Sequence, residues 1–282
     1  MRSNLKYYFP VFVLPTLLAF AIAFLVPFFV GLFLSFCDFT TITDAEWVGV
    51  QNYVDALTDT RSGFVDSFIF TAMVVVVSIV TVNIIAFSIA WVLTLKLKGT
   101  NFFRTVFFMP NLIGGIVLGY TWQVIINAIL AKYATTIIAD WKYGYIGMII
   151  LINWQLIGYM MIIYIAGLQN VPPELIEAAE LDGAGRWTVL RHVTIPMVMP
   201  SITICLFLTL ANTFKLYDQN LALTNGAPQN KTEMVALNIV NTMFFRIGEE
   251  GVGQAKAVIF VVIVVAIAMF QIRATRGREV EA

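Results

Sequence analysis

Charged side chains are scarce in this sequence. Of its 282 residues, 12% are charged and 60% are hydrophobic, and the mean hydropathy is +0.85. A soluble domain carries about 25% charged and about 45–50% apolar residues. So little charge cannot coat a globule in water, and the charges here cluster between long uncharged runs. The composition therefore predicts a protein embedded in a lipid bilayer.

Residues that carry catalytic or metal chemistry are also few. The net charge is zero, which gives no basic surface for nucleic acid. The single histidine, His192, has no partner ligands nearby in the sequence, and Cys37 and Cys205 have neither metal-ligand nor disulfide spacing. No GxxxxGK[ST] phosphate loop occurs, and no paired carboxylates or nucleophile–base pair supports an enzyme. We expect a chain without a catalytic site, metal or cofactor of its own.

Long apolar runs predict an all-α membrane protein with about six transmembrane helices, in a single transmembrane domain over residues 1–282. A span needs about 20 apolar residues. The predicted spans lie near 9–36, 68–95, 103–129, 145–168, 199–217 and 255–272. The first is too long for a cleaved signal peptide, so we expect it to remain attached.

Basic residues predict the orientation of these spans, because cytoplasmic loops are enriched in lysine and arginine. With the N-terminus in the cytoplasm, the inner side carries Arg2, Lys6, Lys96, Lys98, Arg104, Arg186, Arg191, Arg273, Arg276 and Arg278. The connection LKLKGTNFFR and the tail RATRGR concentrate these charges, whereas the outer loops 37–66 and 218–254 are longer and mostly acidic. Both termini are therefore expected in the cytoplasm.

The longest cytoplasmic connection, 169–198, has the signals of a helix–glycine–helix elbow. Pro172 or Pro173 suits the first turn of a helix, and Gly183 provides a stop. A second short helix is expected from Arg186 to Val193, ending at Pro196. The elbow lacks the basic polar face of a helix that lies on lipid, so we interpret it as a docking element for another protein.

The segment EAAELDGAGRWTVLRHVTIP resembles the cytoplasmic signature loop of ATP-binding-cassette importer permeases. That signature is Glu-Ala-Ala, three residues, Gly, nine residues, then an Ile-x-Leu-Pro-like ending; Val193 and Ile195 depart from it mildly. Four further stretches resemble the carbohydrate-uptake, maltose-type branch of this family. They are FVGLFLSFCDF with WVGVQNY, FFRTVFFMPN, FKLYDQNLALTNGAP and GQAKAVIF.

The resemblance implies the partners of the chain. A homologous second permease would complete a heterodimer, two copies of a cytoplasmic ATPase would use ATP and Mg, and an extracytoplasmic solute-binding protein would deliver a sugar. It also implies the cytoplasmic (cell inner) membrane of a prokaryote. The residues expected to couple the chain to the ATPase are Glu177, Ala178, Ala179, Asp182, Gly183 and Pro196. Glu177 would form an ion pair or helix-terminus contact, the alanines would let the helix seat closely, and Gly183 would set the bend.

The same resemblance implies a substrate path through the spans. Matching to maltose-type subunits places it at Asn111, Gly115, Gln155, Leu156, Tyr159, Asn212, Thr213 and Leu216. Neutral amides and an aromatic ring suit the hydroxyls and apolar face of a sugar. Each polar side chain could instead only tie helices together.

Two other functions remain open from the sequence. The chain could serve the same importer class for another solute, such as an amino acid, a polyol or a phosphate ester. It could also be an ion-coupled secondary transporter, although neither inverted repeats nor mid-span carboxylates are visible. ATP dependence of transport would separate these two classes.

Overall fold

The computed structural model describes residues 5–59, 63–95 and 98–277. Some of the basic residues from which the orientation was predicted lie outside this description, namely Arg2, Lys96 and Arg278 and the side chains of Lys6 and Arg276. The chain divides into two compact units, Met1–Phe64 with Ile239–Val261, and Val65–Asn238 with Val262–Ala282. We call them unit 1 and unit 2 and describe each separately.

Unit 1 opens with a long apolar helix. Its elements up to Phe64 are α1 (Leu5–Phe20), a π-helical turn (Ala21–Leu25), α2 (Val26–Leu34), β1 (Cys37–Asp38), a 3-10 turn (Ile42–Asp44), β2 (Glu46–Trp47) and α3 (Gln51–Thr58). Pro27 lies in the first turn of α2, directly after the π turn, where its missing N–H is tolerated. The two short strands pair antiparallel, Cys37 opposite Trp47.

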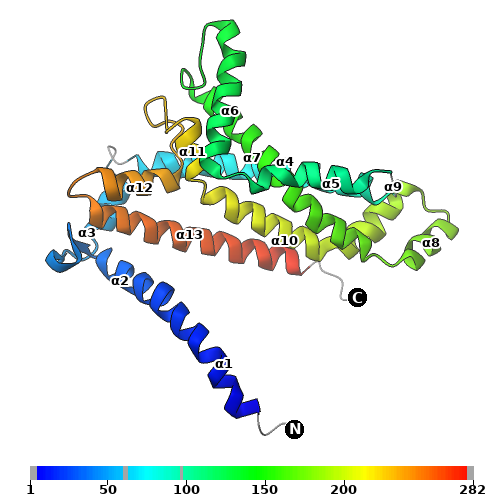
Figure 1. The fold of residues 1–282 in the computed structure, drawn as a ribbon, viewed down its shortest axis with the longest axis horizontal. Helices are drawn as coiled ribbons and strands as arrows, with labels where there is room; N and C mark the ends of the chain where they lie inside the picture. Colours follow the sequence, from blue (N-terminus) through cyan, green and yellow to red (C-terminus); the bar gives the residue numbers. More distant parts are fainter. Residues whose placement is uncertain (1–4, 60–62, 96–97, 278–282) are drawn as a thin grey trace. The chain divides into compact units, whose positions relative to one another are not determined.

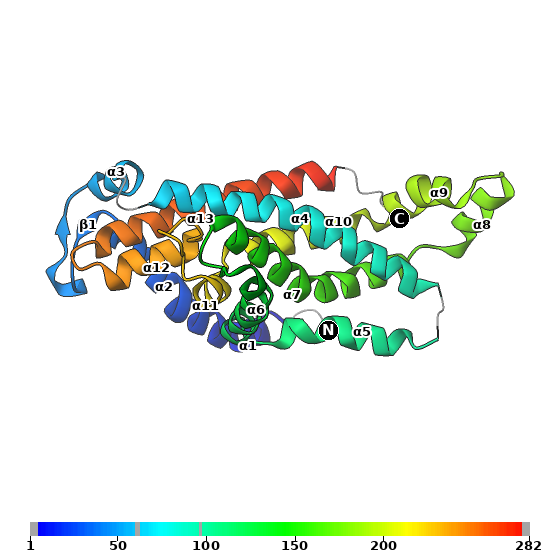
Figure 2. The same ribbon diagram turned by 90° about the horizontal axis from the view of Figure 1, so that it is seen from above.

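Unit 2 is built from helices. In chain order these are α4 (Phe64–Thr94), α5 (Thr100–Phe108), a 3-10 turn (Met109–Leu112), α6 (Gly115–Leu130), a 3-10 turn (Ala131–Tyr133), α7 (Trp141–Gln169), α8 (Pro173–Leu181), α9 (Arg186–Val189), a π-helical turn (Leu190–Thr194), α10 (Ile195–Phe214) and α11 (Asp218–Leu223). Helix α12 (Val235–Phe245) leads from unit 2 into unit 1, and α13 (Glu250–Arg276) leads back. Figures 1 and 2 show the ribbon from two sides.

Six segments of the described chain are long and apolar enough to cross a membrane, which confirms the predicted fold class. They are Val11–Leu34, Phe64–Thr94, Gly115–Tyr133, Trp141–Gln169, Arg186–Phe214 and Glu250–Thr275. Four of them match the predicted ranges to within several residues at their ends. The third and the fifth differ, each for a reason that involves proline.

The third segment is not the uninterrupted span expected at 103–129. Helix α5 ends at Phe108, the 3-10 turn over Met109–Leu112 contains Pro110, and α6 begins only at Gly115. Proline lacks the N–H that would continue the helical ladder, and Gly114 has an extended ψ of 142°. Within unit 2, α6 therefore stands away from the direction of α5 and α7 in Figure 1 and is seen end-on in Figure 2.

The fifth segment begins earlier than the predicted residue 199. The short helix expected to stop at Pro196 instead runs on, so that Arg186–Phe214 forms one helical segment. The intervening π turn shifts the hydrogen bonds, with the Ile195 N–H bonded to the Leu190 carbonyl. Pro196 then falls in the first turn of α10, where a missing N–H breaks no bond.

Helix α7 forms the centre of unit 2. Its side chains Met148, Leu151, Ile152, Met160 and Met161 are fully buried, and they belong to an apolar core shared with α4 and α10. On another side, Gly158 lies so close to α5 that a Cβ there would meet the backbone of Phe107 and Phe108. Helices α7 and α10 of this core carry five of the eight residues predicted to line a substrate path.

Candidate functional site

The elbow between α7 and α10 consists of α8, Gly183 and α9. Pro173 occupies the first turn of α8, as the sequence suggested, and Glu174 follows it there. At its end, the Gly183 N–H bonds to the Glu180 carbonyl and the Ala184 N–H to the Ala179 carbonyl, both at 3.0 Å. This is a Schellman motif, which requires a left-handed residue after the helix. Gly183 supplies it with φ +82°.

The outer surface of the elbow mixes carboxylates with exposed apolar side chains. Glu177, Ala178 and Asp182 are exposed and Ala179 is half-buried. Leu181 and Trp187 are 89% and 71% exposed. In both views of unit 2 the elbow lies at the far end of α7 and α10, remote from α11 (Figures 1 and 2). Pro196 lies deeper, half-buried at the start of α10.

The residues predicted to line a substrate path are distributed over five parts of unit 2. Asn111 lies in the 3-10 turn after α5, and Gly115 opens α6. The remaining residues come from α7, from the end of α10 and from the link to α11, namely Gln155, Leu156, Tyr159, Asn212, Thr213 and Leu216.

Two of these residues, Gly115 and Gln155, meet at a third element that the sequence did not suggest. A Cβ on Gly115 would lie 2.7 Å from the Asp218 Cβ and 3.0 Å from the Gln219 Cδ. The Gln219 Nε2 donates to the Gln155 Oε1 at 3.0 Å. Gln219 of α11 therefore joins the first residue of α6 to the middle of α7.

Other members of the predicted path are held within the fold instead. Leu156 and Leu216 belong to the apolar core of unit 2. The Asn212 Nδ2 donates to the Leu208 carbonyl of its own helix at 2.8 Å. Thr213 is fully buried, and its Oγ1 has no hydrogen-bond partner among the described residues. Asn111 and Tyr159 are half-buried.

A buried polar network ties α4, α7 and α10 together. The Tyr164 hydroxyl donates to the Asn83 Oδ1 at 2.7 Å, and the Asn83 Nδ2 donates to the Thr209 Oγ1 at 3.2 Å. Tyr164 and Thr209 are 2% and 0% exposed. Satisfied polar groups inside a membrane segment fix how helices pack. These three residues therefore explain how polar atoms are accommodated in the interior of unit 2.

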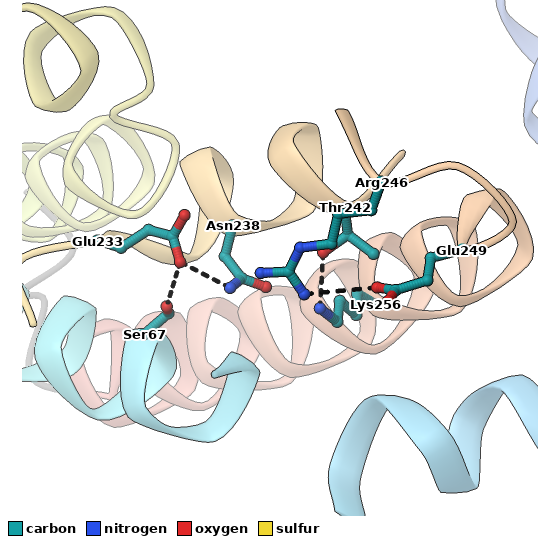
Figure 3. A network of polar contacts seen from close by, with 7 residues as sticks. All are labelled: Ser67, Glu233, Asn238, Thr242, Arg246, Glu249 and Lys256. Atoms are coloured by element: carbon teal, nitrogen blue, oxygen red, sulfur yellow. Dashed lines mark hydrogen bonds and ion pairs between the residues drawn. The ribbon is translucent and has the colours of Figure 1, made fainter. Parts of the chain in front are cut away.

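Two charged side chains are buried in the described structure, Glu233 within a predicted outer loop and Lys256 within the predicted sixth span (Figure 3). In unit 2, the Glu233 Oε2 accepts from Asn238 Nδ2 at 2.8 Å and from Ser67 Oγ at 3.4 Å. In unit 1, Lys256 lies inside α13, is fully buried, donates to Thr242 Oγ1 at 2.7 Å and sits 5.7 Å from the centroid of the Phe64 ring. Lys256 is the only charged residue between Glu250 and Arg273 of α13, and a cation at the start of an otherwise uncharged run is the sequence signal for it.

The loop after α11 is fastened by a buried asparagine. The Asn220 Nδ2 donates to the Thr232 carbonyl, and the Met234 N–H donates to the Asn220 Oδ1, both at 2.8 Å. The Thr232 hydroxyl in turn donates to the Ala227 carbonyl at 2.7 Å. This loop and α11 therefore form one fixed structure.

No group of three or more metal-ligating side chains occurs in the part of the chain that was described.

Comparison with known proteins identifies the family. The model of the family described as "Binding-protein-dependent transport system inner membrane component" matches residues 4–275. This chain belongs to that family. The predicted resemblance is thereby confirmed, and the chain is a membrane transport component rather than an enzyme.

Members of this family include relatives at substantial identity. The chain is 42% identical over 278 residues to the probable starch degradation products transport system permease protein AmyD of Thermoanaerobacterium thermosulfurigenes, covering 96% of this chain and 94% of that protein. It is 30% identical over 285 residues to the multiple sugar-binding transport system permease protein MsmF of Streptococcus mutans, covering 98% and 97%.

The fold also matches a solved member of this transporter class. A chain of a bacterial ABC transporter involved in the import of the acidic polysaccharide alginate superposes with a TM-score of 0.82, covering 97% of each chain at 18% sequence identity. At that identity the match concerns the fold alone. It agrees with the helical arrangement of an ABC importer permease.

Proposed function

We propose that this chain is one of two permease subunits of an ATP-driven importer for sugars, with starch-derived oligosaccharides as the substrate class. The observation that carries the proposal is the 42% identity to AmyD along nearly the whole chain. A solute-binding protein delivers the sugar outside, and a separate ATPase pair uses ATP and Mg inside. The chain lies in the inner membrane of a prokaryotic cell, and both of its termini lie in the cytoplasm.

The elbow is the proposed contact to the ATPase. Its exposed apolar side chains Leu181 and Trp187 are unsuited to water and suit a partner surface. Ala178 presents no side chain beyond Cβ, which lets a partner approach closely, and Glu177 offers an exposed carboxylate beside it. Because the end of α8 is fixed at Gly183, the elbow is rigid, and movement of the ATPase is transmitted to α7 and α10 together.

Reconstitution tests both the function and the role of Glu177. The chain is placed in liposomes with its co-encoded permease, ATPase and binding protein, and uptake of labelled maltose, maltotriose, an amino acid, a polyol and a phosphate ester is followed. The proposal predicts uptake of a starch-derived sugar only when ATP is supplied on the cytoplasmic face. Glu177→Lys lowers this uptake at least about tenfold, because loss of a desolvated interfacial charge pair costs about 2–5 kcal/mol.

Glu180→Lys is the matched control, since it makes the same charge change at an exposed position of the same helix. It should reduce uptake much less than Glu177→Lys. Equal losses in both variants would refute the specific role of Glu177 while leaving the importer intact. ATP-dependent uptake of only the amino acid or the phosphate ester would rule out a sugar as the substrate.

A further inference from the structure

We infer that Gln219 of α11 is a substrate-contacting residue that forms, with Gln155 of α7, a two-amide clamp for neighbouring hydroxyls of a sugar. The inference rests on the proposed function, because it concerns the same substrate path. Gln219 was outside the set of residues implied by family resemblance. Its assignment comes from the meeting of α6, α7 and α11.

The position of Gln219 is fixed by close packing around it. Its side chain lies against Gly115, where a Cβ would come within 3.0 Å of Cδ and 3.1 Å of Nε2. One turn later, a Cβ on Gly119 would come within 2.7 Å of the Ala222 Cβ. Two glycines spaced by four thus let α11 approach α6 closely, and this approach brings Gln219 to Gln155.

The amide pair retains hydrogen-bonding capacity. One bond joins the two side chains, from Gln219 Nε2 to Gln155 Oε1 at 3.0 Å. Within the described residues, the Gln155 Nε2 and the Gln219 Oε1 make no other hydrogen bond, and both side chains are only half-buried. The pair therefore keeps an unused donor group, the Gln155 Nε2, and an unused acceptor, the Gln219 Oε1, next to the bond that joins the two side chains. Exchanging O and N in both amides would still leave one of each.

A donor next to an acceptor matches the chemistry of a sugar. Adjacent hydroxyls of a pyranose can each donate and accept, so one hydroxyl accepts from Gln155 while its neighbour donates to Gln219. Neutral amides hold such a ligand without the desolvation that a charged pair would require. The clamp thus recognises a neutral polyhydroxyl ligand rather than a compact ion.

Gln219 is not needed to anchor α11. That task falls to Gln123 of α6, whose Nε2 donates to the backbone carbonyl of Leu223 at 3.0 Å. The contact of Gly119 with Ala222 adds further packing. Gln123 bonds only to backbone in α11, so it supplies a control that loosens α11 but leaves the amide pair in place.

The test combines permease variants with sugar analogues in the reconstituted complex. Wild type, Gln219→Leu, Gln155→Leu, the double variant and Gln123→Leu are each assayed for ATP-dependent uptake of maltotriose and of its singly deoxygenated analogues. The same binding protein delivers every sugar, so its own preference cancels when variants are compared. Each variant is assayed at an equal amount of assembled complex, and the isosteric Gln219→Glu replaces Gln219→Leu if the latter does not assemble.

The inference predicts that Gln219→Leu lowers kcat/KM for maltotriose about 3- to 10-fold, the effect of one lost hydrogen bond. Wild type takes up at least one deoxygenated analogue less efficiently than maltotriose, whereas this variant takes up that analogue and maltotriose equally well. The double variant loses less than the product of the single losses, because the two amides act together. Gln123→Leu preserves the wild-type ratio between sugars.

The contrary result is equally clear. If Gln219→Leu lowers uptake of all sugars by one common factor, or behaves as Gln123→Leu does, Gln219 only ties helices and the inference is overturned while sugar import stands. If wild type takes up no sugar with ATP, the proposed function fails and the clamp fails with it. The two failures are therefore distinguished by the wild-type arm alone.

Discussion

Gly158→Ala should separate α5 from α7, because these helices are in backbone contact at this glycine. A Cβ at position 158 would lie 2.7 Å from the Phe108 backbone nitrogen and closer still to the Phe107 carbonyl, whereas ordinary contact begins at 3.4 Å. Both partners are backbone atoms, so no side-chain rotation relieves the overlap. Helix α5 must shift as a body, and it leads directly into the turn that carries Asn111.

The expected cost is that of overpacking a close interface, about 1–3 kcal/mol. For a chain of this size about 2–4 °C is lost per kcal/mol. The purified complex should therefore lose its monodisperse peak on size exclusion at a temperature about 2–12 °C below that of wild type. Uptake should also fall, because Gln155 and Tyr159 flank Gly158 on α7.

Gly114→Ala is the control for this variant. Gly114 has φ −59°, and nothing lies within 4 Å of a Cβ built there, so alanine should be accepted with little change. Close packing at Gly158 is refuted if Gly158→Ala is as stable and as active as Gly114→Ala. It is also refuted if both variants are destabilised alike.

Three further outcomes follow from other parts of the structure. Gly183→Ala should lower coupled uptake at equal assembled protein, because the left-handed conformation at φ +82° costs about 1–2 kcal/mol for a residue with Cβ, whereas Gly185→Ala, at φ −70°, should be near neutral. Asn220→Ala should lower thermal stability by about 1–3 kcal/mol for each of the two buried backbone groups it leaves unpaired, as measured by heating the purified complex. Asp44 and Thr41 form a capping box in the 3-10 turn Ile42–Asp44, and the backbone N–H of Thr41 lowers the pKa of the Asp44 carboxyl below its ordinary 3.8. The capping box is therefore intact above pH 3.8 and is lost as the pH falls through the lowered pKa. A titration of this carboxyl with a midpoint at or above 3.8 would contradict this.

Composition and local helix signals predicted much of this fold, because membrane insertion acts on each span separately. A run of about 20 apolar residues is needed whatever lies beside it, and so the six segments could be found. The stop at Gly183 was likewise predictable, since a left-handed helix end is a local preference for glycine.

The breaks at proline were harder to predict, because they depend on neighbouring turns. Pro196 was expected to end a helix, but the π turn before it places the proline where no N–H is required. Pro110 was expected within a span, but there α5 stops and α6 turns away to pack on α11. Neither the π turn nor the packing of α11 has a signal within a short sequence window.

The substrate path was predicted in part. Gln155 and Gly115 were implied by resemblance, and the structure brings both to α11. Gln219 was missed because α11 is a six-residue helix outside every predicted span. An amide there has none of the free-energy cost that marks a polar side chain inside a membrane span. Its significance arises only from contacts between residues 64 and more positions apart in the chain.

The most direct test of the account is a simultaneous measurement of sugar uptake and ATP hydrolysis by the reconstituted complex, with all ion gradients collapsed. We predict that maltotriose accumulates only with ATP on the cytoplasmic face and that hydrolysis rises when the loaded binding protein is present outside. Uptake and hydrolysis should stop together when this chain is omitted. Uptake that ignores ATP and follows an imposed ion gradient would contradict this prediction and would identify a secondary transporter.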